Sequence, residues 1–242
     1  MSGPMLYERT VALNKTEHHD LKINIRDNHY EFARTTNAMP LSISEFADAS
    51  RNYPVVFIQS EENQFHVVAL MGLENASNLF VSPEGSWDKD AYIPGFARRY
   101  PFILGTTEDK SSLAVYVDES YSGLGKDDGL AFFENGEESA YLKQLMEFLR
   151  AYQNEISVSQ KFASRLYKMG LLEARSITVT QDGEDKVLSG FWVVNDEKFD
   201  KLDDKMVVEL FHNGALALIE LHRASLGNIQ NLARRAERLT TK

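Results

Sequence analysis

The sequence predicts an α+β fold in which a central, mostly antiparallel sheet carries flanking helices and the C-terminal end is helical. Two hairpin patterns predict the antiparallel pairing, and apolar residues at helical spacing fill the chain from residue 205 to residue 239. Strand and helix patterns interleave along the 242 residues, without a composition break or an internal repeat. We therefore expect a single α+β domain at residues 41–242, preceded by an N-terminal arm at residues 1–40.

The first fifty residues carry weak patterns. Apolar and polar residues alternate across residues 21–26, which predicts either a short strand with one buried face or an extended arm across the main body. Ser42 or Ser44 is suited to the N-cap of a short helix at residues 45–50.

The first hairpin pattern consists of two apolar runs, at residues 53–59 and 64–71, separated by the polar residues 60–63. The pattern predicts a hairpin with a four-residue loop. Because both runs are apolar on both faces, the two strands should be central in the sheet rather than at its edge. Two further strands are expected at residues 102–104 and 113–117.

The second hairpin pattern is the clearest in the chain. Runs at residues 175–180 and 186–194 flank the dipeptide Asp182-Gly183. Asp-Gly favours the positive φ values of a tight turn, so these runs should pair directly.

The expected helices follow Ser139, an N-cap residue after which apolar residues recur at helical spacing. Two helices are expected between residues 137 and 169, with a break near Asn154, and Gly170 suits the position just beyond a helix end. Three further helices are expected at residues 205–212, 216–226 and 229–239.

Composition and charge exclude several classes of protein. The formal net charge of −10 disfavours a nucleic-acid binder, because such proteins need a basic face. The chain contains no cysteine, which excludes disulfides, thiolate zinc sites and cysteine nucleophiles. No apolar run reaches the length of a signal-peptide core or of a spanning helix, so we expect a cytoplasmic protein without membrane insertion.

The sequence contains no motif from which a reaction could be derived. It lacks the Gly-x-Ser-x-Gly elbow of hydrolases, the phosphate-binding P-loop and the glycine fingerprint of dinucleotide-binding folds. Consequently, no catalytic residue and no cofactor are predicted.

The six histidines do not predict a metal site. His18 and His19 are adjacent, and adjacent side chains on an extended chain point to opposite sides. His66 interrupts an apolar strand and is expected to be a hydrogen-bonded core histidine. His212 and His222 lie where a histidine can interact favourably with the carbonyl end of a helix.

Residues 85–104, with the sequence GSWDKDAYIPGFARRYPFIL, form the strongest candidate for a functional site. Aromatic side chains are concentrated beside two arginines, and Pro94 and Pro101 restrict the backbone on either side of a short helical turn. Such a combination suits recognition of a carboxylate, a phosphate or a sugar. The candidate ligand-binding residues are Trp87, Asp88, Tyr92, Arg98, Arg99 and Tyr100.

The same segment also fits a brace within the core. Aromatic side chains are mostly core residues, and an ion pair between Asp88 and either Arg98 or Arg99 would neutralise a buried charge. We favour this structural interpretation for the segment as a whole, with Trp87 in the core and one of the two arginines facing a cleft.

Several blocks of the chain resemble the SapC family in order and spacing. They are YPVVFIQ, ALMGLENASNLFV, GSWDKDAYIPGFARRYPFIL, AFFENGEESAYL, SGFWVVNDEKFDKL and GALALIELHRASLGNIQNL. The resemblance as a whole runs from about residue 5 to residue 239. The family takes its name from a surface-layer association in bacteria, and the resemblance implies no catalytic residues. Family members are often encoded near TonB-dependent receptors, halogenase-like proteins and cupin-like proteins, which implies an accessory role in nutrient uptake or peptide modification.

The leading hypothesis is a non-catalytic binding or accessory protein that works with a protein partner or with a small anionic or carbohydrate ligand. One alternative is an enzyme, or an enzyme subunit, whose site assembles from scattered residues such as His66, Asp88 and Arg99 around residues 87–100. A second alternative, implied by the family name alone, is a surface-layer accessory factor. A pocket beside Trp87 and Arg99 would favour a ligand, whereas a flat apolar patch on the C-terminal helices would favour a partner.

Overall fold

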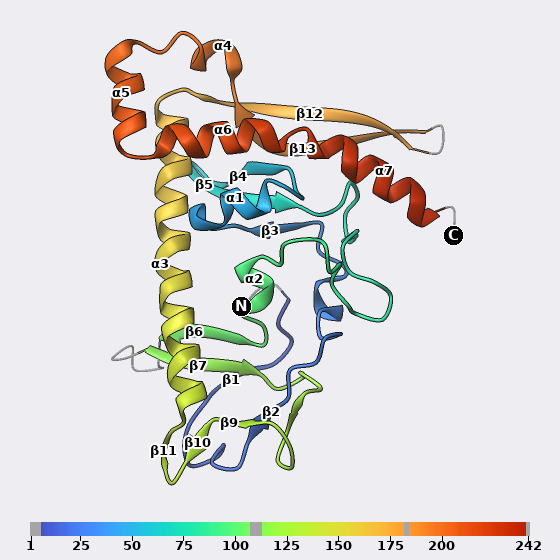
Figure 1. Ribbon diagram of the computed structural model, residues 1–242, viewed down its shortest axis with the longest axis vertical. Helices are drawn as coiled ribbons and strands as arrows, with labels where there is room; N and C mark the ends of the chain where they lie inside the picture. Colours follow the sequence, from blue (N-terminus) through green and yellow to red (C-terminus); the bar gives the residue numbers. More distant parts are fainter. Residues whose placement is uncertain (1–5, 107–112, 182–183, 241–242) are drawn as a thin grey trace.

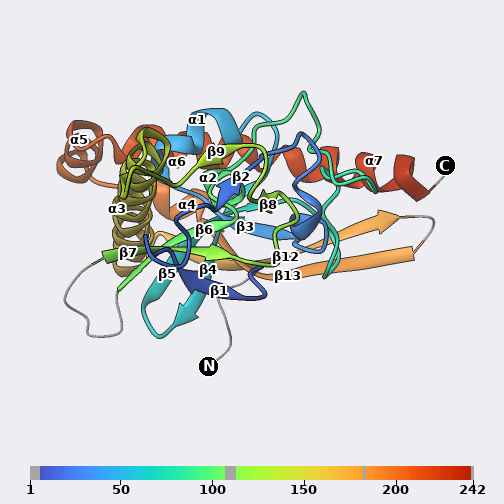
Figure 2. The ribbon, with the colours of Figure 1, turned by 90° about the horizontal axis from the view of Figure 1, so that it is seen from below.

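A single 29-residue helix, α3 (Ala140–Lys168), runs along most of the molecule and joins its two halves. The computed structural model describes residues 6–106, 113–181 and 184–240. In Figure 1 a large sheet and the C-terminal helices occupy the upper half, and two small sheets occupy the lower half. Seen from below, α3 stands at one side of the molecule and is viewed nearly end-on (Figure 2). The predicted α+β class, with antiparallel sheets, flanking helices and a helical C-terminus, is confirmed.

The upper sheet has five strands in the order β12-β13-β4-β5-β3, and every neighbouring pair is antiparallel. Its central strands are the two apolar runs of the first hairpin, as predicted. The loop between them is shorter than expected, because pairing continues to Glu61 and Gln64 and leaves only Glu62 and Asn63 in the turn, where Asn63 adopts a φ of 63°. The strands are β3 (Ala38–Pro40), β4 (Val55–Glu61), β5 (Gln64–Leu70), β12 (Leu172–Gln181) and β13 (Glu184–Val194).

The hairpin of β12 and β13 pairs as the sequence predicts, from Leu172 opposite Val194 to Gln181 opposite Glu184. The Asp182-Gly183 dipeptide that was expected to form its turn lies outside the described residues.

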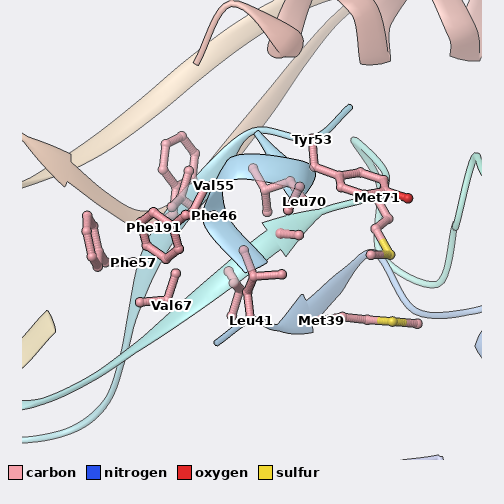
Figure 3. Packing of buried hydrophobic residues seen from close by; sticks show 14 of the residues in the cluster. Met39, Leu41, Phe46, Tyr53, Val55, Phe57, Val67, Leu70, Met71 and Phe191 are labelled. Atoms are coloured by element: carbon pink, nitrogen blue, oxygen red, sulfur yellow. The ribbon is translucent and has the colours of Figure 1, made fainter. Parts of the chain in front are cut away.

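The first core fills the space around the five-stranded sheet. Short helices η2 (Ile43–Glu45) and α1 (Phe46–Ala49) follow Ser42, which takes the predicted N-cap position. Figure 3 shows Phe46 packed with side chains of β4, β5 and β13. Fully or almost fully buried members of this core include Met39, Leu41, Phe46, Tyr53, Val55, Phe57, Phe65, Met71, Leu166, Phe191 and Ile219.

The lower half contains two three-stranded sheets, with orders β1-β7-β6 and β8-β2-β9, and a small hairpin of β10 and β11. The strands at residues 102–104 and 113–117 were predicted, whereas the short strands beyond residue 118 were not. These elements are β1 (Thr10–Ala12), β2 (Lys22–Ile23), β6 (Phe102–Thr106), β7 (Leu113–Asp118), β8 (Leu124–Gly125), β9 (Leu130–Ala131), β10 (Phe133–Glu134) and β11 (Glu137–Glu138).

A second core packs beneath the first, around β6, β7 and the N-terminal half of α3. Residues 6–40 contribute β1, β2 and β3 to three different sheets, and η1 (Glu31–Ala33) packs between the halves. Asp118, fully buried, holds part of this segment in place, because its carboxylate accepts hydrogen bonds from the backbone N–H groups of Glu8 and Arg9. The second core comprises Tyr7, Ile23, Tyr100, Phe102, Val115, Val117, Tyr121, Phe132, Leu142, Leu145 and Leu149.

The prediction of two helices with a break near Asn154 is wrong, since α3 is continuous. Its N-terminus is capped by Ser139, whose side chain accepts from the Leu142 N–H, and Gly170 follows its C-terminus with a φ of 73°. Asn154 is exposed, whereas Leu149 and Tyr152 are buried in the second and the first core. Tertiary packing on both sides of Asn154 therefore outweighs its weak helix propensity.

The C-terminal region folds back over the upper sheet, where α6 packs on β4 and β13 and α7 contacts β12. Three of its helices were predicted, and one additional turn, α4, follows an Asn195 cap that the sequence analysis missed. No helix within the described ranges is both long enough and apolar enough to cross a bilayer. The helices are α4 (Asp196–Phe199), α5 (Asp204–His212), α6 (Ala215–Ser225) and α7 (Asn228–Thr240).

Candidate functional site

Residues 85–104, which we call the aromatic–arginine segment, lie where the two cores meet, against the middle of α3. Its central turn, α2 (Gly95–Arg98), begins after Pro94 and was expected from the two flanking prolines. Phe96 belongs to the first core and Tyr100 to the second, so the chain passes from one core to the other through this turn. Ligand sites often form at such junctions, because side chains from two packed units converge there.

Trp87 lies in the first core, with only 7% of its surface exposed. Its indole N–H donates to the Tyr53 hydroxyl at 3.2 Å, and its ring meets Tyr30 edge to face. Tyr100 is equally buried and stacks on Phe32, with ring centroids 3.8 Å apart. These two members of the predicted set therefore hold the segment against both cores.

Asp88 does not pair with Arg98 or Arg99, which corrects that expectation. Its carboxylate accepts from Arg235 of α7, and Arg235 also donates to the backbone carbonyl of Leu79. The three side chains face different elements. Asp88 precedes α2 and faces the C-terminal helix, whereas the two arginines face η2 and α3. Asp88 is thus separated from the other predicted residues and anchors α7.

Glu45, which the sequence analysis did not select, organises the segment. It is buried, with 5% of its surface exposed, and both carboxylate oxygens accept hydrogen bonds. Oε1 accepts from the Gly95 N–H at 2.6 Å and from the Tyr92 hydroxyl at 2.9 Å. Oε2 accepts from the backbone N–H and the hydroxyl of Ser42, both at 2.9 Å. An acidic residue three positions after an N-cap serine is the sequence signal that could have identified it.

Arg98 points outward and closes this network on its exposed side. Its Nε donates to the carbonyl of Ile93, and one terminal nitrogen donates to the Tyr92 hydroxyl, each at 3.0 Å. The same nitrogen lies 3.8 Å from Glu45 Oε1, and 46% of the Arg98 side chain is exposed. Arg98 is therefore committed to partners within the protein.

Arg99 points to the opposite side and lies among aromatic rings. Its guanidinium carbon is 4.4 Å from the centroid of Phe96, 5.2 Å from Tyr152 and 5.8 Å from Tyr7. Cation–π contact of this kind fixes the position of the cation without occupying its N–H groups. Two polar atoms here are buried without a hydrogen-bond partner in the described part of the chain: Arg99 Nε and the Tyr152 hydroxyl.

The tyrosines around the arginines are held in their neutral form. Burial raises the pKa of Tyr7 to about 12, and Arg99 acts in the opposite direction. Burial likewise raises the pKa of Tyr92 to about 12, assisted by the Glu45 carboxylate. The pKa of Tyr152 is also raised by burial, against the influence of Arg99. At neutral pH these hydroxyls are therefore hydrogen-bond donors rather than bases.

We call the group formed by Tyr7, Glu45, Tyr92, Arg98, Arg99 and Tyr152 the junction site. It brings together three of the predicted ligand-binding residues, Tyr92, Arg98 and Arg99, and adds residues from η2, α3 and the N-terminal segment. Its free donors, Arg99 Nε–H and the Tyr152 O–H, suit an acceptor oxygen such as that of a carboxylate or a phosphate.

The histidines lie away from the junction site, and two of them correct the sequence interpretation. His66 is only half-buried and contacts Ser60 and Gln160, so it is not a core residue. His222 lies in the last turn of α6, as expected, but its ring is fully buried and contacts the sheet instead of the helix end: its Nε2 accepts from the Val194 N–H at 3.0 Å, and its Nδ1 lies 2.7 Å from the Val55 carbonyl. In the residues that the structure describes, no group of three or more His, Asp or Glu side chains is arranged to hold a metal ion.

Comparison with known proteins identifies the family. The SapC family model matches residues 13–232, which is nearly the whole chain. Neither the curated proteins nor the solved structures provide a match. The matched range includes Glu45, the aromatic–arginine segment and all of α3, so the junction site lies within the family's common region apart from Tyr7. The chain belongs to the SapC family.

Proposed function

We propose that this chain is a non-catalytic, cytoplasmic binding or accessory protein that takes a small anionic ligand at the junction site. One observation carries the proposal: Arg99 Nε and the Tyr152 hydroxyl are buried and have no partner in the described residues, and the Arg99 guanidinium carbon lies 5.2 Å from the centroid of the Tyr152 ring. A carboxylate or a phosphate offers acceptor oxygens for both donors.

The energetic argument concerns the cost of leaving these donors unpaired. A buried polar group without a hydrogen bond costs about 1–3 kcal/mol, and more when the group is charged. The Arg99 guanidinium carbon lies 4.4 Å from the ring centroid of Phe96 and 5.2 Å from that of Tyr152. A ligand whose acceptor oxygens reach these donors recovers the cost of leaving them unpaired, which favours binding over an unliganded state.

The protonation state of the tyrosines supports binding rather than proton abstraction. Tyr7 and Tyr152 both have a raised pKa and remain neutral near pH 7, so they donate hydrogen bonds and do not act as general bases. Glu45, the nearby carboxylate, already accepts four hydrogen bonds from within the protein. The residues of the junction site are thus suited to hold a ligand and have no group left to transform it.

The test uses Tyr152→Phe, which removes an unpartnered hydroxyl. We expect the free energy of unfolding to stay constant or to rise by about 1 kcal/mol, because a buried unpaired polar group is lost. The matched control is Tyr121→Phe. Tyr121 is similarly buried, but its hydroxyl donates to the Asn24 carbonyl at 3.1 Å, so this variant should lose about 1 kcal/mol.

Binding is followed directly at Arg99, because the Nε–H of an arginine can be observed by NMR. Acetate and inorganic phosphate, each titrated in the millimolar range, are the probes. We expect at least one of them to shift the Arg99 Nε–H resonance in the wild type and in Tyr121→Phe, and to shift it much less in Tyr152→Phe. No shift with either probe, or equal shifts in all three proteins, would overturn the proposal.

A further inference from the structure

The C-terminal half of α3 carries a polar stripe that borders a groove and is partly exposed to solvent. Counted from Ser157, the other members follow after three, four, seven, eight and eleven residues. This spacing places them along one side of the helix. This side faces β5 and encloses a groove of about 510 Å³ together with Gln64, Phe65 and His66. We call it the β5–α3 groove; the stripe consists of Ser157, Gln160, Lys161, Ser164, Arg165 and Lys168.

The groove exists because the edge of β5 is only half covered. Strand β3 pairs with β5 only at residues 68–70, so the N-terminal half of β5 has no neighbouring strand on that side. Helix α3 lies there instead, and the Phe65 N–H donates to the Ser164 hydroxyl at 3.4 Å. A helix cannot follow a strand edge as closely as another strand does, and the space between them remains lined by polar groups.

The charge of the groove is opposite to that of the whole chain. Lys161, Arg165 and Lys168 line it, and no carboxylate does, although the chain has a formal net charge of −10. Arg165 is paired with Glu209 of α5 at 2.5 Å. Within the described ranges, the side chains of Lys161 and Lys168 form no ion pair and no hydrogen bond. Two cations thus lie along one side of the groove, about two helical turns apart, without a counter-charge, which favours an anionic occupant.

The floor of the groove adds directed hydrogen bonds to this charge. The two ring nitrogens of His66 contact the Ser60 hydroxyl at 2.9 Å and the Gln160 amide at 3.1 Å, which fixes the ring beside α3. Burial lowers the pKa of His66, so the ring is neutral until a negative charge approaches. Serine hydroxyls and glutamine amides near the lysines supply further donors, as a group with several acceptor oxygens requires.

We propose that the β5–α3 groove binds a diphosphate group, as a site separate from the junction site. Lys161 and Arg165 are one helical turn apart, as are Arg165 and Lys168, and such neighbours have Cβ atoms about 5–6 Å apart. Long side chains at this spacing can converge on two linked phosphates. The many donors of the groove suit phosphate oxygens better than a single carboxylate, which offers fewer acceptor positions.

The test is calorimetric titration of the full chain with inorganic pyrophosphate and with adenosine diphosphate at low ionic strength. The groove variant is Lys161→Gln with Lys168→Gln. The control is Lys143→Gln with Arg150→Gln, two exposed cations on the same helix outside the groove, which changes the net charge by the same amount. We expect the groove variant to lose at least about tenfold in affinity and the control less than about twofold. Weaker binding of adenosine diphosphate would indicate free pyrophosphate as the preferred ligand.

An independent readout comes from His66. Pyrophosphate should raise the pKa of His66, measured by NMR, in the wild type and in Tyr152→Phe, but not in the groove variant. Because Tyr152→Phe affects only the junction site, this result separates the present proposal from the proposed function. Equal losses of affinity in the groove variant and the control, the absence of pyrophosphate binding, or tighter binding of poly-glutamate than of pyrophosphate would each overturn it.

Discussion

Replacement of Glu45 by Gln tests whether the buried carboxylate positions the arginine-bearing turn. The change keeps the shape of the side chain but replaces one acceptor oxygen by an NH₂ group. Oε1 faces the Gly95 N–H and Oε2 faces the Ser42 N–H, so the NH₂ group meets a backbone donor in either orientation.

The magnitude follows from these contacts. One buried backbone N–H is left unpaired, at a cost of about 1–3 kcal/mol, and the remaining hydrogen bonds lose the contribution of a charged acceptor, about 1 kcal/mol each. Part of this loss is offset because a charge no longer has to be buried. We therefore expect Glu45→Gln to lower the free energy of unfolding by about 3 kcal/mol.

Urea denaturation at neutral pH measures the effect, with the midpoint and the slope fitted separately. The control is Glu147→Gln, an exposed glutamate on α3, for which a change within about 0.5 kcal/mol is expected. If Glu45→Gln is no less stable than this control, the four donors do not hold an ionised carboxylate, and our account of how α2 is positioned is wrong.

Two further predictions concern the first core. His222 is neutral in the fold because burial lowers its pKa to about 4, against an ordinary value of 6.5, so its contribution to stability is complete above pH 6.5 and is lost as the pH falls towards 4. Over that range the free energy of unfolding of the wild type should fall by about 3 kcal/mol relative to that of His222→Gln. The control His212→Gln, which changes an exposed residue, should follow the wild type. Parallel pH profiles for all three proteins would contradict this prediction. Trp87→Ala should cost about 3–5 kcal/mol in urea denaturation because it leaves a cavity, and a loss below about 1 kcal/mol would show that the site is loosely packed.

Local patterns in the sequence were sufficient to predict most strands and helices. The first hairpin and the second were visible because strand periodicity and turn residues agree, and Ser139, together with Ser42 as one of two candidates, was recognised as a cap from its position alone. The errors occur where tertiary contacts, rather than local propensity, determine the secondary structure. Asn154 has weak helix propensity, yet the two cores pack on both sides of it and keep α3 continuous.

The candidate site was located from the sequence, but its contacts were not. Aromatic residues beside arginines drew attention to residues 85–104, and the structure places three of the six selected side chains in one network. Asp88 was assigned the wrong partner, because its contact with Arg235 joins positions 147 residues apart. Glu45 was missed for the same reason: its acceptor role depends on Gly95 and Tyr92, fifty and forty-seven residues away.

The continuity of α3 also determines how the two proposed sites relate. Arg98 and Arg99 are neighbours in the chain, but about 100° of helical rotation separates adjacent residues, so one faces Glu45 and the other faces Tyr152 of α3. Tyr152 belongs to the junction site and Lys161 to the β5–α3 groove, nine residues further along the same rigid helix. A helix broken at Asn154 would have placed these two side chains on independent elements. Because α3 is unbroken, Tyr152 and Lys161 stand on one element, and the spacing between the two proposed sites is set by this helix.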